Sequence, residues 1–225
     1  MSDSTNVFLT VRGQTKAETI DAARIAHNDT AGSPQGIAAA RSFGDLSHKV
    51  YVPVTGGRSS AKPGEILFHD LWEAPEGLMQ FFAVPEVQAQ GAKLFHAKDP
   101  TVWMPARGAY TFHMPAPARK NERLVGMIRG KIASPEKAID VFRAATAKNV
   151  RDARRRGQIS HELYIKMNAP GDNSPLELLG VDVWFDGDGM REHYSGMEMS
   201  ALAPVFTGPP DASIWQQAPG DWSEW

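Results

Sequence analysis

The sequence predicts an α+β protein built from two copies of one β-α-β-β-α-β unit. The first observation is an internal repeat, because Trp72 and Trp103 recur as Trp184 and Trp215, each 112 positions later. The second observation is that both copies show the same succession of strand-like and helix-like hydrophobic patterns. Self-similarity at a fixed spacing is typical of a duplicated structural unit. A chain of 225 residues is long enough for two such domains.

The spacing between the two copies changes only where loops are expected. His48 recurs as His161, 113 positions later, and Ile20 recurs as Ile139, 119 positions later. The first copy carries an insertion at residues 32–36, a cluster of Gly and Pro that we expect to form a loop. This insertion explains most of the change in spacing.

The second copy shows each element in order. Its first strand ends before Ser134 and Pro135, which suit the N-cap and the first position of a helix. Apolar and polar residues alternate around His161, which indicates a strand. The expected elements are strands at residues 124–132, 159–165, 176–184 and 212–217, and helices at 135–150 and 190–206, the latter interrupted near Ser195-Gly196.

This order is that of a ferredoxin-like unit, in which four antiparallel strands carry both helices on one face. The other face of each sheet needs a cover, because an exposed apolar face would aggregate. We therefore predict tandem ferredoxin-like repeats forming an intramolecular α+β barrel. The first repeat covers residues 1–116 and the second covers residues 117–225, with the junction near residues 115–121.

Composition excludes several classes of function. The 24 Lys and Arg against 26 Asp and Glu give no net positive charge to attract nucleic acid or an anionic membrane. No apolar run reaches the roughly 18 residues of a membrane span, and the polar residues 1–6 lack a signal pattern. The absence of Cys excludes disulfides and thiolate chemistry. We expect a cytoplasmic protein with no nucleic-acid or membrane partner.

The second copy carries a short pattern with a known counterpart. Asp182 and Trp184, followed by an acidic turn and His193, resemble the acidic-x-Trp…His pattern of the antibiotic-biosynthesis-monooxygenase family of dimeric α+β barrels. That family usually has Glu where this chain has Asp182. The resemblance implies a cavity between helices and sheet that takes flat, hydrophobic, oxidisable ligands. Members of the superfamily include cofactor-independent monooxygenases, haem-degrading and haem-binding proteins, isomerases and small stress proteins.

The two copies differ at the positions that could carry chemistry. His193 and Tyr194 of the second copy correspond to Phe81 and Phe82 of the first. A duplicated protein often keeps its polar chemistry in one half. We therefore expect the working cavity in the second repeat.

Five residues are candidates for this cavity. His193 is the predicted catalytic general base, since its ordinary pKa of about 6.5 allows proton exchange at neutral pH. Trp184, Tyr194, His161 and Asp182 are the predicted substrate-binding residues. Core packing is the alternative for Trp184, and a buried structural role is the alternative for His161, which recurs as a duplicated position.

No metal site is predicted, because the seven histidines include no His-x-x-x-His or His-Glu-x-x-His spacing. The aromatic residues Trp215, Trp222 and Trp225 lie close together in the sequence. Exposed tryptophan is unfavourable in water. We expect this segment to pack onto the body of the protein or onto a neighbouring chain.

The predicted function is cofactor-independent monooxygenation, or a related redox conversion, of a phenolic, quinol-like or polycyclic aromatic molecule. The expected partner is this small hydrophobic ligand, and a homodimer stays open. One alternative is haem binding or haem processing, with His161 or His193 as the axial ligand. Others are an isomerase or lyase on the same fold, and a non-catalytic binding or stress protein. A different fold, tandem modules of the glyoxalase type, would need a strand at residues 190–206.

Overall fold

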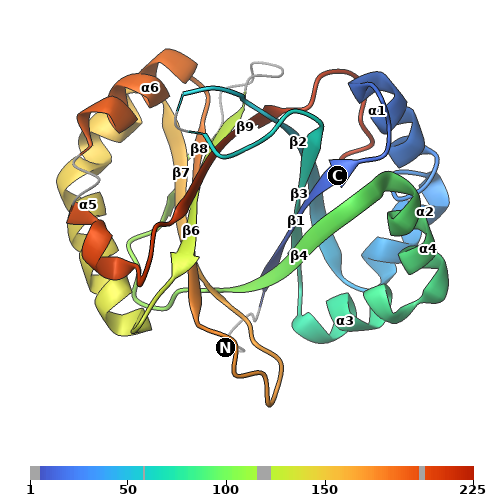
Figure 1. Ribbon diagram of the computed structural model, residues 1–225, viewed down its shortest axis with the longest axis horizontal. Coiled ribbons are helices and arrows are strands. Elements are labelled where there is room, and N and C mark those ends of the chain that lie inside the picture. Colours follow the sequence, from blue (N-terminus) through green and yellow to red (C-terminus); the bar gives the residue numbers. More distant parts are fainter. Residues whose placement is uncertain (1–5, 58, 116–122, 198–200) are drawn as a thin grey trace. The chain divides into compact units, whose positions relative to one another are not determined.

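The computed structural model describes residues 6–57, 59–115, 123–197 and 201–225. Figure 1 shows two units, each a sheet with its helices. Unit 1 comprises Met1–Pro53, Lys62–Met104 and Gln217–Trp225, and unit 2 comprises Val54–Ala61 and Pro105–Gln216. The expected junction at residues 115–121 lies, apart from Pro115, outside the described residues.

Unit 1 is an antiparallel sheet with helices on one face (Figure 1). The strands lie in the order β4-β1-β3-β2. The elements are β1 (Val7–Thr15), α1 (Ile20–Asn28), α2 (Pro34–Ser42), β2 (Asp45–Pro53), β3 (Glu65–Trp72), α3 (Pro75–Ala83), α4 (Pro85–Leu94) and β4 (Phe95–Pro105).

Unit 2 repeats this arrangement, with strands in the order β9-β6-β8-β7-β5. The elements are β5 (Phe112–His113), β6 (Leu124–Lys131), α5 (Pro135–Arg155), β7 (Gln158–Lys166), β8 (Glu177–Trp184), α6 (Gly187–Gly196), the short 3-10 helix η2 (Ala203–Val205) and β9 (Asp211–Gln217). Both units follow the predicted β-α-β-β-α-β order, which confirms the α+β class and the ferredoxin-like units.

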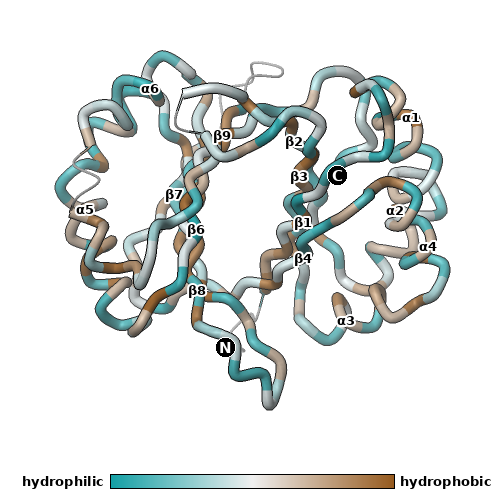
Figure 2. Tube along the Cα trace, viewed as in Figure 1, coloured by the Kyte–Doolittle hydropathy of each residue, from teal (hydrophilic) through white to brown (hydrophobic). Residues whose placement is uncertain are grey.

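Helix α5 forms where the sequence signals place it. The Ser134 hydroxyl caps the helix by accepting a hydrogen bond from the Lys137 backbone N–H, and Pro135 is the first helical residue. The buried residues of the helix recur at helical spacing and are Ala138, Phe142, Val150 and Ala153. Figure 2 shows the helices alternating between hydrophobic and hydrophilic residues along their course, as one buried and one exposed side require. No helix in the described ranges is long and apolar enough to cross a membrane.

The expected loop at residues 32–36 is wrong, because a helix begins within it. The Ser33 hydroxyl accepts a hydrogen bond from the Gly36 N–H, and Pro34 is the first residue of α2. The Ser-Pro pair therefore acts as a helix start, as Ser134-Pro135 does in the second copy. Two short helices, α1 and α2, stand where the second repeat has the single helix α5.

The segment at residues 190–206 is helical in its first part only. Helix α6 ends at Gly196, which confirms the expected interruption, and after residues outside the described ranges the 3-10 turn η2 follows. The segment therefore carries helical elements where the glyoxalase-type alternative needs a strand, and that alternative is wrong.

The aromatic segment at residues 217–225 packs within unit 1, as expected. The Trp225 ring stacks on the His48 ring, with centroids 4.7 Å apart, and the Trp222 ring lies 5.2 Å from the His27 ring. The His48 backbone N–H donates to the Trp225 carbonyl oxygen at 2.8 Å. Burial of the indole rings and strand-like pairing along β2 together hold the segment in place.

Candidate functional site

Unit 2 contains a cavity of about 190 Å³ bounded by its sheet and by helices α5 and α6. Apolar side chains and backbone from β6, α5 and β9 form much of the wall. The lining residues with polar side chains are Ser59, Thr146, Asn149, Gln158, His161, Asp182, His193, Tyr194 and Ser213. An apolar cavity with a few convergent polar groups is typical of a small-molecule site.

Two glycines in the sheet line this cavity. Gly126 on β6 takes the register position that Leu9 holds in unit 1, and Gly180 on β8 takes the position of Phe68. Leu9 and Phe68 are both buried in the core of unit 1. Glycine weakens a strand interior and often marks a place where another group approaches closely. The Tyr194 hydroxyl occupies the space beside Gly126, so Gly180 is the position at which unit 2 lacks a large side chain that fills unit 1.

His161 and Asp182 form a hydrogen-bonded pair in the cavity wall. They are directly opposite each other on β7 and β8, so their side chains share one face of the sheet. The His161 Nδ1 lies 2.6 Å from the Asp182 Oδ1, and the His161 Nε2 lies 3.0 Å from the Thr146 hydroxyl on α5. With the Nδ1 proton donated to the carboxylate, Nε2 is the basic nitrogen and accepts from Thr146.

The carboxylate sets the basicity of this imidazole. Burial lowers the pKa of His161, but the charge and hydrogen bond of Asp182, together with Glu162, outweigh burial and raise that pKa above its ordinary value. His161 is only 8% exposed, so water screens this attraction weakly. The pair is therefore a stronger proton acceptor than an isolated buried histidine.

Tyr194 ties helix α6 to the same carboxylate. Its hydroxyl donates to the Asp182 Oδ2 at 2.8 Å and accepts from the Trp184 indole N–H at 3.3 Å. Burial, followed by the negative charge of Asp182, raises the pKa of Tyr194 well above its ordinary value. The phenol therefore stays protonated and acts as a fixed hydrogen-bond donor. Asp182 thus accepts from His161 and Tyr194 at once.

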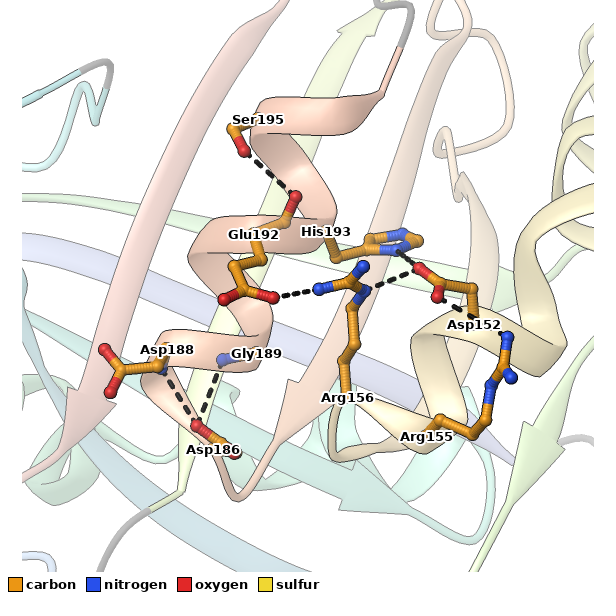
Figure 3. A network of polar contacts seen from close by, with 9 residues as sticks. All are labelled: Asp152, Arg155, Arg156, Asp186, Asp188, Gly189, Glu192, His193 and Ser195. Carbon is orange, nitrogen blue, oxygen red and sulfur yellow. Dashed lines mark hydrogen bonds and ion pairs between the residues drawn. The ribbon is translucent and has the colours of Figure 1, made fainter.

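His193 projects from α6 toward α5 (Figure 3). Its Nδ1 lies 3.8 Å from the Asp152 Oδ2, and the Arg156 Nε donates to the same carboxylate oxygen at 2.7 Å. Burial lowers the pKa of His193, and the attraction of Asp182 and Asp152 opposes this only in part. The imidazole is therefore neutral at neutral pH. Arg156 also forms an ion pair with Glu192, which joins the two helices at this point (Figure 3).

The structure brings four of the five predicted site residues to one cavity: His161, Asp182, His193 and Tyr194. Trp184 is fully buried and is absent from the described cavity lining. Its ring lies behind the site, with its centroid 5.2 Å from the His193 ring and 5.7 Å from the Tyr194 ring. Trp184 therefore supports residues of the cavity and does not face its interior.

Sequence reasoning missed Thr146, Gln158 and the two glycines. Gly126 and Gly180 could have been found by comparing the copies, because each replaces a large apolar residue at a matched strand position. Thr146 lies at the border between the buried and exposed sides of the amphipathic helix α5. A threonine at such a border does not by itself indicate a functional role. Its role appears only once α5 packs against β7.

Unit 1 holds a matching pair against which a large side chain packs. The His48 Nδ1 lies 2.5 Å from the Asp70 Oδ1, and the His27 Nε2 lies 3.0 Å from the His48 Nε2. The Phe68 ring packs against both imidazoles, with centroids 5.4 Å from His27 and 5.0 Å from His48. The histidine–aspartate pair is thus common to both repeats, and the two differ in that Phe68 packs against the pair in unit 1 where unit 2 has Gly180.

The residues lining the cavity do not fit haem. The described lining contains no Lys or Arg to pair with the propionates, and a volume of about 190 Å³ is too small to enclose a macrocycle of four pyrrole rings. Both ring nitrogens of His161 already have partners. Among the described residues, no group of three or more His, Asp or Glu side chains is arranged to hold a metal ion.

No protein-family model and no curated protein matches the sequence. Solved structures do match over nearly the whole chain. An anthrone oxidase-like protein is 12% identical with a TM-score of 0.69, covering 97% of this chain and 93% of its own. A protein from Fusobacterium nucleatum proposed to be a monooxygenase is 11% identical with a TM-score of 0.62, covering 96% and 94%. Chlorite dismutase from Candidatus Nitrospira defluvii is 12% identical with a TM-score of 0.55, covering 95% and 92%. These likenesses show the fold, an α+β barrel of two fused ferredoxin-like units.

Proposed function

We propose, starting from this fused α+β-barrel fold, that the second repeat is a cofactor-independent monooxygenase acting on a phenol- or quinol-type aromatic. The observation that carries the proposal is the His161–Asp182 pair beside an apolar cavity. The names of the structural neighbours, an anthrone oxidase-like protein and a proposed monooxygenase, support the same reaction class. The fold alone does not assign chemistry, so the site carries the argument.

The cavity volume restricts the substrate. A cavity of about 150 Å³ holds one benzene ring, and the cavity of unit 2 measures about 190 Å³. It therefore suits one aromatic ring, or two fused rings at most, in its present form. We propose a mono- or bicyclic phenol rather than a larger polycyclic compound.

The first step is removal of the phenolic proton. His161 accepts the proton at Nε2, either directly when the substrate hydroxyl displaces the Thr146 hydroxyl or through that hydroxyl. Asp182 stabilises the imidazolium that forms. Tyr194 holds Asp182 in position from its other side. The phenolate produced is electron-rich enough to transfer one electron to molecular oxygen.

The remaining steps need no reagent other than molecular oxygen. The phenoxyl radical and superoxide combine at the ring carbon para to the oxygen, and the proton from His161 completes a hydroperoxide. His193, neutral and facing the same cavity, then takes the proton from that carbon as the O–O bond breaks. The departing hydroxide receives this proton and leaves as water. The net change is phenol plus O₂ to para-quinone plus water.

His161 replaces His193 as the proposed first base. Asp182 raises the pKa of His161, whereas burial lowers the pKa of His193. His161 also has a hydrogen-bonded carboxylate to fix its orientation, while the nearest carboxylate oxygen to His193 is 3.8 Å away and is engaged by Arg156. His193 is proposed for the second proton transfer.

Oxygen uptake with α-naphthol tests the proposal. Under isotopically labelled oxygen gas, we expect the para-quinone to carry one labelled atom and the rate to fall at least about 100-fold in His161→Asn, the range of a lost general base. The matched control is His48→Asn, which breaks the equivalent pair in unit 1 and should leave the rate unchanged if the melting temperature shows a folded protein. Unchanged turnover in His161→Asn, or accumulation of hydrogen peroxide in place of labelled quinone, would contradict the proposal.

A further inference from the structure

A buried carboxamide in the cavity has no partner of its own. Gln158 is the first residue of β7 and lies directly opposite Trp184 on β8. Opposed residues of an antiparallel pair share a face, so the Gln158 side chain is on the face that meets the helices. It lines the cavity and is only 4% exposed. Its carboxamide makes no hydrogen bond with any residue in the described part of the chain.

A carboxamide with no protein partner is available to another one. Polar groups in the interior of a protein normally have a hydrogen bond to protein, water or ligand. The equivalent residue of unit 1, Asp45, does have a partner, since its carboxylate accepts from the Ser47 N–H at 3.2 Å. Asn149 also lines the cavity but is partly exposed, so water can satisfy it. Gln158 is more deeply buried than Asn149, so its carboxamide is available to an occupant of the cavity.

We infer that Gln158 is a second polar anchor in the cavity, which binds an oxygen on the aromatic ring other than the one that His161 deprotonates. A carboxamide carries both a donor and an acceptor, so it can bind a carbonyl or a hydroxyl group. The substrate class is therefore a phenol with a second oxygen function, a hydroxyl or a ketone, at a position other than the para carbon that the proposed reaction oxidises. This inference rests on the proposed function, because it assigns the first oxygen to His161.

Such an anchor makes the site specific because it disfavours ligands that lack the second oxygen. A site that is built to hydrogen-bond a substrate oxygen disfavours an analogue that lacks it, because the analogue leaves the buried amide unpaired. The apolar wall around the two anchors, formed by residues such as Ile128 and Phe142, would by itself bind either molecule. Discrimination between ligands of the same shape therefore reports on Gln158.

Equilibrium binding of two matched ligands tests this without turnover. meta-Hydroxyacetophenone and meta-ethylphenol have the same ring, hydroxyl and chain length, and differ by a carbonyl oxygen. Calorimetric titration of the wild-type protein should show about tenfold tighter binding of the ketone, the value of one good hydrogen bond. Gln158→Leu should abolish this preference while keeping the affinity for meta-ethylphenol. Gln158→Met, which keeps the length of the side chain but has no hydrogen-bond donor, should also abolish it.

The matched control is Asp45→Asn at the equivalent position of unit 1, which should leave both affinities unchanged. Binding of meta-ethylphenol without a preference for the ketone, or a preference that survives in Gln158→Leu, would overturn the inference and leave the proposed function intact. If neither phenol binds, or if His161→Asn leaves both affinities unchanged, the proposed function and the inference both fail. Thermal melts of each variant show whether it is folded.

Discussion

Gly126 lies directly against the hydroxyl of Tyr194. A methyl group at Gly126 would collide with that hydroxyl and the end of the Tyr194 ring. The strand therefore has glycine where helix α6 sends a phenol across the sheet to Asp182. The absence of one side chain in β6 is what allows the hydrogen-bonded unit of His161, Asp182 and Tyr194 to form.

Gly126→Ala should thus damage the site more than the fold. We expect the added methyl to displace the Tyr194 hydroxyl from Asp182, since the methyl group and the hydroxyl cannot occupy the same space. Loss of this hydrogen bond to a charged group should cost about 1.5–3 kcal/mol. A crystal structure of the variant, with oxygen-uptake kinetics, checks the prediction. Gly171→Ala is a control because nothing lies near it, although its positive φ of 83° adds modest strain. A variant with Tyr194 still bonded to Asp182 would contradict the prediction.

Gly180→Phe should close the cavity. Phe68 fills the equivalent position in unit 1, so the second repeat would acquire the same filling. We expect loss of ligand binding, with a change in unfolding free energy of about 1–3 kcal/mol in either direction depending on fit. Titration with meta-ethylphenol and a thermal melt measure both effects. Retained binding in a folded Gly180→Phe protein would show that the ligand occupies another place.

Asp45→Asn should stabilise the protein at high pH. Burial, and then the charge of Asp70, raise the pKa of Asp45 to about 7. Between pH values of about 3.8 and 7, the carboxyl of Asp45 is ionised in the unfolded state but still protonated in the folded state. The free energy of unfolding therefore falls as the pH rises through this range. We expect the variant to gain about 2 kcal/mol over the wild type at a pH of about 8 and little at a pH of about 4. Urea unfolding at both values measures this, and an equal effect at the two would contradict it.

Asp182→Asn should reverse the shift in the pKa of His161. The carboxylate is what outweighs burial, so without it the pKa should fall below the ordinary value of 6.5. Because the pKa of His161 is raised in the folded wild type, the His161–Asp182 pair stabilises the fold fully at pH values below 6.5. This stabilisation is lost as the pH rises through the raised pKa of the folded state. Titration of the His161 ring protons by NMR follows the shift. The matched variant Asp70→Asn in unit 1 should leave the His161 titration unaltered.

Much of the fold could be predicted because the chain repeats itself and each helix start has a local signal. Ser134 and Pro135 begin α5 by capping chemistry that involves neighbours in sequence. The same chemistry at Ser33 and Pro34 begins α2, and that helix was missed because the Gly and Pro around it are also typical of a loop. The ambiguity is physical, since a helix N-terminus and a turn use the same residue types.

The site was predicted in part for a related reason. The difference between His193-Tyr194 and Phe81-Phe82 located the cavity in the second repeat, where the structure has it. The choice of base could not be made in this way, because the order of basicity depends on which carboxylate each imidazole meets. Asp182 and His161 are 21 positions apart, and only strand pairing makes them partners.

The sequence by itself determined the duplication, the order of elements and the absence of thiol chemistry, because these depend on residue type and on contacts between near neighbours. The tertiary structure decided how the two repeats differ around the same pair of residues. The same histidine–aspartate pair packs against Phe68 in unit 1 and borders a cavity in unit 2, where Gly180 takes the place of that phenylalanine. The physical reason is that a cavity is a property of side chains that meet across strands and helices, and no single stretch of sequence contains it.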